Sequence, residues 1–350
     1  MNDTTTKHNK TQQKIDLKLF KKIIIQNLNA TNEKILIIGD KGYKNNTIAT
    51  ILTEAYTLAA KELNKNYETI YQNFKGRGDQ ADEILIKKLK EIPNKSILII
   101  NVSNRIGKLG NLGLSFRKYA KEKEHKFISS SSLGSIKNEN LQLILNCLDI
   151  DYKEIEKQTN QLAKKLTNAK KIQITTKAGT NIEMNVEGIQ AKTATGIYKN
   201  PGEGGNLPGS EAYIAPKTET INGIIIIDGS ARLKDETILI KEPIKLQVTK
   251  GIIKVINNTP EAQKLKKTLQ WAHNKSLHPE NVWKIGELGI GLNKKAKIIG
   301  STIIDEKTYN TCHFAIGSNN WFGGDIKSII HLDQVIKNPT IKIDGKIIEP

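Results

Sequence analysis

The segment from Lys284 to Ile336 combines strand-like apolar sequence with the residue types that hold metal ions. Its informative parts are KIGELGIGLN at 284–293, IIGSTIIDEKTYNTCHFAIGSNNWFGG at 298–324 and IIHLDQVI at 329–336. Four such residues lie in these parts, namely Glu287, His313, His331 and Asp333. A charged side chain in an apolar interior is costly unless it is paired or bound to a metal. We therefore expect the chain to be organised around these four side chains.

The spacing of the four residues predicts that they converge. His331 and Asp333 are two residues apart, so in a strand both side chains point to the same face. His313 lies in the strand-like CHFAI, and the glycines that closely follow Glu287 let another part of the chain approach. Two imidazoles and two carboxylates together suit Zn, Mn, Co or Fe.

The composition predicts a globular protein of two domains. The chain has 350 residues and a net charge of +18, but only four of its 54 basic residues are arginine. Nucleic-acid readers rely on arginine for bidentate contacts, and here lysine is spread along the whole chain, so we expect no nucleic-acid partner. Cys147 and Cys312 are the only cysteines, which indicates a reducing compartment. With no apolar signal segment and no run long enough to cross a membrane, a cytoplasmic location without membrane attachment is expected.

The first part of the chain predicts a parallel α/β domain. We expect a disordered tail over residues 1–15 and then a doubly wound domain over residues 16–150. Strand patterns alternate with amphipathic helical patterns in this region, which implies parallel pairing with right-handed crossovers. The expected strands are near 34–40, 67–71, 96–102 and 125–132, and the expected helices near 16–27, 48–63, 80–92 and 114–123. No nucleotide-binding fingerprint follows the first strand.

The second part, residues 151–350, predicts a mainly antiparallel, β-rich α+β domain that carries the metal site. A long amphipathic helix is expected at 151–167, followed by short strands with turn signals between them and one further helix at 260–274. The sequence PTIKIDGKIIEP at 339–350 has Asp-Gly at its centre and predicts a terminal hairpin. Asp305 and Glu306 are expected in a hairpin turn.

A glycine-rich loop adds a further acid to this set. The sequence KNPGEGGNLPGSEAYIAPKTE at 199–219 delivers Glu211 just where an apolar stretch resumes, which fits a metal ligand or an oxyanion-binding loop. Glu203 in the same loop is a candidate general base, although a solvated loop acid is the more ordinary interpretation of that position.

Several of these segments, in this order, resemble the aminopeptidase T and aminopeptidase S type of thermophilic metallo-aminopeptidases. The matching motifs are NLPGSEAYIAP, GELGIGLN, CHFAIGSNNWFGG and IHLD. The resemblance implies a two-domain homodimer with two divalent ions (Zn, Co or Mn) that removes the N-terminal residue from peptides. It also implies a set of metal ligands, which would be Glu211, Glu287, His313, His331 and Asp333.

Such a site would activate a water between two metal ions about 3.5–4 Å apart. We assign Glu287 as the bridging carboxylate. Members of the family carry a tyrosine seven residues after the ligand histidine, and Asn320 stands there in this chain. If the tyrosine stabilises the tetrahedral intermediate, Asn320 would have to donate that hydrogen bond from a shorter side chain.

Two other functions remain open on the sequence alone. The same fold is similar to 2,5-dihydroxypyridine dioxygenase, in which two histidines and an aspartate hold one Fe(II), and His313, His331 and Asp333 match that ligand set. The presence of both Glu211 and Glu287 favours two metals over one. A non-catalytic member of the family, with Asn320 marking lost chemistry, is the other alternative.

Overall fold

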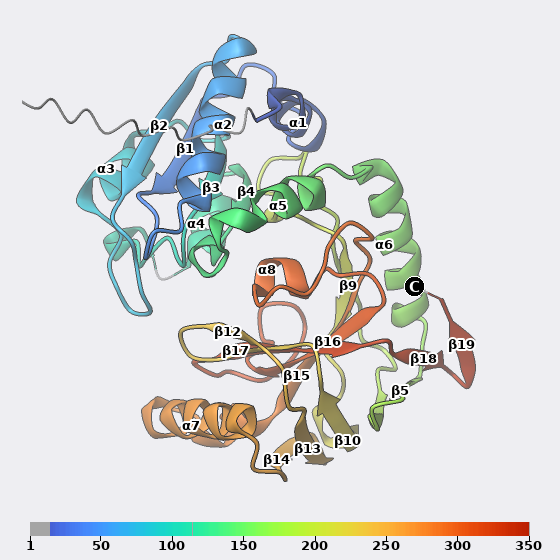
Figure 1. Cartoon of the computed structure of the whole chain (residues 1–350). Helices are drawn as coiled ribbons and strands as arrows, with labels where there is room; N and C mark the ends of the chain where they lie inside the picture. Colours follow the sequence, from blue (N-terminus) through green and yellow to red (C-terminus); the bar gives the residue numbers. More distant parts are fainter. Residues whose placement is uncertain (1–14, 114, 350) are drawn as a thin grey trace, which may run out of the picture.

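Four strands from the first half of the chain and a fifth from its second half form a parallel sheet (Figure 1). The computed structural model describes residues 15–113 and 115–349, so the tail predicted at 1–15 lies, except for Ile15, outside the described residues. The strands run in the order β2 (Tyr67–Gln72), β1 (Ile35–Asp40), β3 (Ile97–Asn101), β4 (Lys126–Ser130) and β8 (Gly204–Asn206). Every pairing between them is parallel, which confirms the predicted α/β architecture.

Helices cover both faces of this sheet, as continuous apolar strands require. Ile35 and Ile37 pack on one face, and Leu36 and Ile38 on the other. The first face is covered by α1 (Leu17–Lys22), its π-helical extension at Ile23–Asn27, α2 (Ile48–Glu62) and α5 (Leu141–Leu148), and the second by α3 (Glu83–Glu91) and α4 (Phe116–Glu122). The α5 helix was not predicted.

The fifth strand, β8, comes from the glycine-rich loop far along the chain. It pairs with β4 at Phe127–Gly204 and Ile128–Gly205. A Cβ atom on Gly204 would lie 2.0 Å from the ring of Phe127, and one on Gly205 would lie 2.2 Å from the hydroxyl of Tyr198. The glycines therefore permit close packing between the two halves of the chain. The division at residue 150 stays a prediction, and β8 is the element that crosses it.

The second half follows helix α6 (Tyr152–Thr167) and contains two antiparallel sheets of seven strands. One has the order β14 (Ile252–Val255), β13 (Ile244–Thr249), β10 (Asn222–Ile227), β6 (Asn181–Asn185), β5 (Lys171–Thr175), β18 (Thr340–Ile343) and β19 (Lys346–Ile348). The other has the order β12 (Thr237–Leu239), β11 (Ser230–Arg232), β17 (His331–Lys337), β16 (Thr311–Gly317), β15 (Ile285–Gly291), β9 (Glu211–Ile214) and β7 (Lys192–Ala194). The predicted antiparallel β-rich domain is confirmed.

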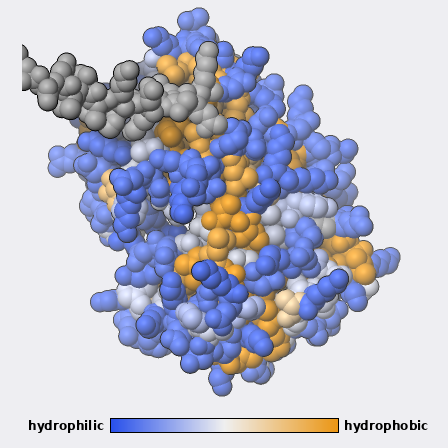
Figure 2. Space-filling model, in the orientation of Figure 1, coloured by the Kyte–Doolittle hydropathy of each residue, from blue (hydrophilic) through white to orange (hydrophobic). Residues whose placement is uncertain are grey.

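One hydrophobic core fills the space between these two sheets and helix α7 (Pro260–Lys275). It draws on alternate residues of many strands, such as Ile244, Leu246 and Val248 of β13. The surface on the side seen in Figure 2 is mostly hydrophilic, with an apolar band running down its middle. None of the helices in the described part of the chain is long and apolar enough to cross a membrane.

The segment between β15 and β16 differs from its prediction. Asp305 does not lie in a hairpin turn but ends a short helix, α8 (Thr302–Asp305). The backbone N–H groups of Ile299 and Gly300 both donate to its carboxylate, at 2.8 and 3.0 Å. This anchor closes the turn before the helix and points Glu306 and Lys307 inward, where both are buried.

Candidate metal site

Four adjacent strands place the acidic and imidazole side chains next to one another. Glu287 of β15, Ala315 of β16 and Asp333 of β17 lie opposite one another across the sheet. Ala315 has a small side chain, so it leaves room for the two carboxylates that flank it. Glu211 begins β9, opposite Gly291 of β15. Because side chains alternate along a strand, His331 falls on the same face as Asp333, as predicted.

The ring nitrogens and carboxylate oxygens of these residues converge on one centre. His331 Nε2 lies 3.3 Å from Asp333 Oδ1 and 3.4 Å from Glu287 Oε2. His313 Nε2 lies 3.4 Å from Glu287 Oε1, 4.0 Å from Asp333 Oδ1 and 3.9 Å from Glu211 Oε2. The structure therefore brings together all five of the metal ligands expected from the sequence.

Each histidine is held with Nε2 toward this centre. His331 Nδ1 donates to the backbone carbonyl of Ser318 at 2.7 Å, because a carbonyl can only accept. That bond fixes the tautomer and leaves the Nε2 lone pair free, the usual arrangement of a metal-binding histidine. The His313 ring lies directly against Gly289, where a Cβ atom would be 2.2 Å from the ring. Glycine at that position is thus required by the ring.

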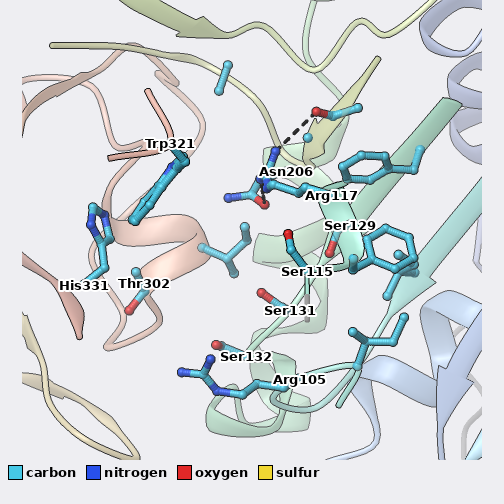
Figure 3. Close-up of a pocket in the computed structure, with 18 of the residues that line it drawn as sticks. Arg105, Ser115, Arg117, Ser129, Ser131, Ser132, Asn206, Thr302, Trp321 and His331 are labelled. Atoms are coloured by element: carbon cyan, nitrogen blue, oxygen red, sulfur yellow. Dashed lines mark hydrogen bonds between the residues drawn. The ribbon is translucent and has the colours of Figure 1, made fainter. Parts of the chain in front are cut away.

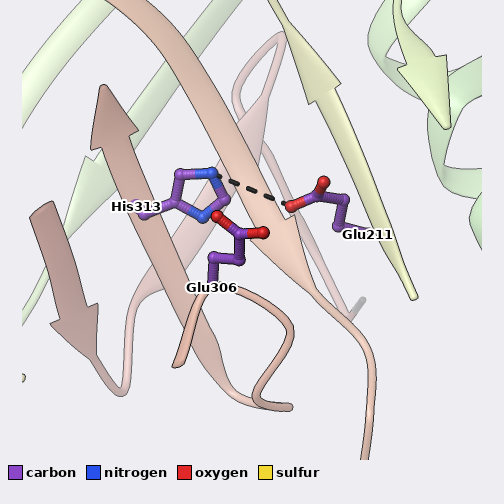
Figure 4. Close-up of side chains that lie close together, drawn as sticks. All are labelled: Glu211, Glu306 and His313. Atoms are coloured by element: carbon purple, nitrogen blue, oxygen red, sulfur yellow. Dashed lines mark ion pairs between the residues drawn. The ribbon is translucent and has the colours of Figure 1, made fainter. Parts of the chain in front are cut away.

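A buried lysine neutralises the other end of the cluster. Lys307 is fully buried, and its ammonium forms ion pairs with Glu211 and, at 2.7 Å, with Glu306. Glu211 and Glu306 flank the His313 ring, and one ligand atom of each of the three residues lies within 4.8 Å of the others (Figure 4). Glu211 thus belongs to an ion-paired network as well as to the expected ligand set.

The pKa values report an excess of negative charge. Burial alone would lower the pKa values of both histidines, but neighbouring carboxylates outweigh it and raise the pKa of His313 to about 9 and that of His331 to about 10. Burial raises the pKa of Glu306 to about 8, although Lys307 opposes the shift. Burial would raise the pKa of Asp333 too, yet the two histidines hold it well below its usual range. A cation is therefore favoured at this centre.

The residues present fit a metal ion by two further observations. Ligands about 2.1 Å from one ion are separated by about 3–4 Å from each other, the range of the distances around Glu287, His313, His331 and Asp333. In addition, Asp333 Oδ1 is buried without a hydrogen-bond donor among the described residues. Buried polar atoms are rarely left in that state unless something else binds them.

The cluster opens into a cavity of about 1110 Å³ between the two halves of the chain. Glu287, His331 and Asp333 line one side of it, together with the aromatic rings of Trp321 and Phe322. Trp321 is 56% exposed and packs edge to face against His331, with the ring centroids 4.9 Å apart. Figure 3 shows Trp321 and His331 facing a wall of serine and arginine side chains from the half of the chain that contains the parallel sheet.

Two residues expected to be catalytic do not lie among the cavity-lining side chains. Glu203 is exposed and accepts bonds from the backbone and side chain of Asn200, so it stabilises its own turn. Asn320 is exposed and accepts a bond from Ser318 Oγ at 2.8 Å. The loop turns outward at Asn320 and inward at Trp321 and Phe322. The structure therefore offers neither residue to a bound substrate.

Glu306 and Lys307 are the members of the site that sequence reasoning missed. Their signal was the run Asp-Glu-Lys at 305–307, which interrupts apolar sequence shortly before the His313 strand. Read as a turn, the run suggests solvated charges. Only the helix that precedes it turns the two side chains inward.

Comparisons with known proteins agree on the fold and identify a family. A model of the 2,5-dihydroxypyridine 5,6-dioxygenase (NicX) family matches residues 138–349. The 2,5-dihydroxypyridine 5,6-dioxygenase of Pseudomonas putida is 24% identical over 192 residues, which are 52% of this chain and 53% of that protein. The match to this curated relative thus spans about half of its length.

Two solved structures share the whole architecture. The dioxygenase structure from Pseudomonas putida KT2440 superposes with a TM-score of 0.71 at 15% identity, covering 95% of this chain and 94% of that one. Wild-type AmpT from Thermus thermophilus superposes with a TM-score of 0.63 at 17% identity, covering 95% and 96%. The resemblance to aminopeptidase T is confirmed for the fold, but the family assignment that it suggested is corrected by the family match. The chain belongs to the 2,5-dihydroxypyridine 5,6-dioxygenase family.

Proposed function

We propose that the chain is a ring-cleaving dioxygenase that uses one Fe(II) ion and acts on a dihydroxylated aromatic ring. The observation that carries the proposal is the ion pairing of Lys307. Its ammonium already pairs with Glu211 and Glu306, so one end of the cluster carries its own cation. The centre next to His313, His331 and Asp333 is then left for a single metal ion. Two histidines and one carboxylate are the ligand set of non-haem iron oxygenases. Membership of the dioxygenase family supports the same choice.

His313, His331 and Asp333 would hold the iron, which supplies the activation of O₂ and of the ring toward each other when it is bound. The Ser318 carbonyl keeps the His331 ring oriented through Nδ1. The ammonium of Lys307 pairs with Glu211 and Glu306 and so offsets their negative charge beside His313. This arrangement assigns Glu211 a charge-balancing role in place of the ligand role expected from the sequence.

Glu287 would accept the proton of a ring hydroxyl. Its carboxylate lines the cavity, is 5% exposed, and lies 3.4 Å from the Nε2 atoms of both histidines. A hydroxyl bound beside the two imidazoles would therefore be within reach of it, as a general base requires. Trp321 and Phe322 form the apolar wall against which the ring would pack, and they restrict the access of water to it.

Oxygen consumption tests this function. The protein is loaded with Fe(II) under nitrogen, mixed with 2,5-dihydroxypyridine and then exposed to oxygen in a closed cell. The expected result is oxygen uptake with loss of the aromatic absorbance, abolished in His331→Ala. The proposal fails if no dihydroxylated ring is consumed while aminoacyl p-nitroanilides are hydrolysed by the Zn- or Co-loaded protein.

That second outcome describes the alternative function, a metallo-aminopeptidase. The specific observation in its favour is the convergence of the five side chains expected to bind two ions, together with the shared fold of AmpT. For that function Glu211 would have to release Lys307 and bind a second ion. A homodimer, as the resemblance implied, is proposed for either function and is tested by sedimentation.

A further inference from the structure

Three of the four arginines of this chain line one cavity. Arg105, Arg117 and Arg232 line it, and the charge of Arg77 interacts with those of Arg105 and Arg232. The lysines, by contrast, are spread over the whole sequence. Because a guanidinium presents a planar fork that matches a carboxylate, this placement of arginine needs its own explanation.

Arg232 is a buried cation that forms no direct ion pair with any described residue. It is 7% exposed, and no carboxylate oxygen of the described residues lies within 4.0 Å of it in an ion pair. Its guanidinium has one long bond, 3.4 Å, to the hydroxyl of Thr237. The strand that carries it, β11, pairs with β17 beside Asp333, so Arg232 lies next to the metal ligands. A buried charge in this state is costly unless a ligand completes it.

The opposite wall of the cavity supplies more hydrogen-bond donors for an anion. Ser129, Ser131 and Ser132 follow one another at the carboxyl end of β4, and their side chains face the same space as Arg105 (Figure 3). Ligands of open parallel sheets bind at such strand ends. Away from the metal cluster, Asp79 is the one acidic residue among the lining side chains. The cavity therefore combines the carboxylates of the metal cluster with the guanidinium groups of Arg105, Arg117 and Arg232.

We propose that the substrate is an aromatic ring that carries a carboxylate, with its ring beside the metal cluster and its carboxylate bound by Arg105 and Arg232. The position of the ring rests on the proposed function, whereas the anion site rests on the arginines. The neutral 2,5-dihydroxypyridine has no carboxylate that could bind at this anion site. A cavity of about 1110 Å³ has room for a larger molecule than one bare ring.

Calorimetric titration of the Fe(II) protein under nitrogen tests the proposal without turnover. The probes are 2,5-dihydroxybenzoate and the matched neutral ring 1,4-dihydroxybenzene. We expect the carboxylated probe to bind at least about tenfold more tightly, the effect of one charge-assisted hydrogen-bonded contact. Arg105→Met and Arg232→Met are expected to reduce its affinity to that of the neutral probe, while Arg232→Lys retains part of it. Lys157→Met, an exposed lysine on α6, is the matched control.

The outcomes separate this proposal from the proposed function. Equal affinities for the two probes, or a difference that survives both methionine variants, would overturn it. Tighter, Arg105-dependent binding of inorganic phosphate or of a dipeptide than of 2,5-dihydroxybenzoate would overturn it as well. Arg105 is accessible in the cavity, so its variant remains informative even if the buried Arg232→Met does not fold. Carboxylate selectivity without oxygen uptake would support the anion site and reject only the dioxygenase.

Discussion

Lys307 is fully buried between two carboxylates, so its removal tests the charge balance of the cluster. In Lys307→Met the carboxylates of Glu211 and Glu306 lose their cation, and we expect a loss of about 3–5 kcal/mol in the free energy of unfolding. Urea unfolding measures it. Lys157→Met, which breaks an exposed pair, is the control and should cost less than about 1 kcal/mol. A loss in Lys307→Met as small as that of the control would show that the pairing does not hold the cluster together.

Glu287 is the residue on which the proposed proton transfer depends. Glu287→Gln keeps the size of the side chain but removes its basicity, so turnover should fall about 10²- to 10⁴-fold while the affinity for Fe(II) changes little. Steady-state oxygen uptake and iron content, measured on the same preparation, give both quantities. A variant that loses its iron would instead identify Glu287 as a metal ligand.

At the scale of the elements, strand β15 has a glycine, Gly289, where the imidazole ring of His313 on β16 lies against it. Alanine at Gly289 would place a Cβ atom 2.2 Å from the ring of His313. We therefore expect Gly289→Ala to displace that ring and to weaken iron binding about 10- to 100-fold, as small shifts around metal ligands do. Competition with a coloured chelator measures the affinity. Gly76→Ala is the control, because its nearest contact is 3.4 Å away. Unchanged affinity in Gly289→Ala would mean that the imidazole does not bind the metal.

The junction of α4 and β4 contains a histidine that should make stability depend on pH. Burial lowers the pKa of His125 to about 4, while Ser96 N–H donates to its Nδ1. Since the unfolded pKa is about 6.5, the stability that this residue gives is fully present above pH 6.5 and is lost as the pH falls toward 4. The full contribution of this shift to the free energy of unfolding is about 3 kcal/mol. His125→Gln should lose correspondingly less stability between pH 7 and pH 5 in urea unfolding. If the free energy of unfolding changed with pH in the same way for the natural sequence and for His125→Gln, this prediction would be wrong.

The sequence predicted those elements whose own residues carry a full apolar pattern, without help from tertiary contacts. The strands around Glu287, His313 and His331 alternate or run apolar, so they and the convergence of their side chains could be foreseen. β8 could not, because Gly204 and Gly205 carry no strand pattern and their need for close packing arises only against Phe127 and Tyr198. For Glu306 and Lys307, a solvated turn and a buried ion pair have the same local sequence. Tertiary contacts decide between them.

At the scale of the whole molecule, the two halves meet around a cavity that both of them line. The half with the antiparallel sheets contributes the metal cluster and Arg232, and the half with the parallel sheet contributes Arg105, Arg117 and the serine side chains. β8 links the halves, because it belongs by sequence to the second and pairs within the first. The resemblance to aminopeptidase T indicated the fold correctly, but it could not indicate the chemistry, since one fold hosts several reactions. That choice depends on how many metal ions the cluster holds.

Metal stoichiometry therefore tests the central claim most directly. The protein is loaded with Fe(II) or Zn(II) under nitrogen, desalted and analysed for metal, for the natural sequence, His331→Ala and Glu211→Gln. The account predicts one iron per chain, lost in His331→Ala and retained in Glu211→Gln, because Glu211 is occupied by Lys307. Two ions per chain, with one of them lost in Glu211→Gln, would contradict it and favour the peptidase.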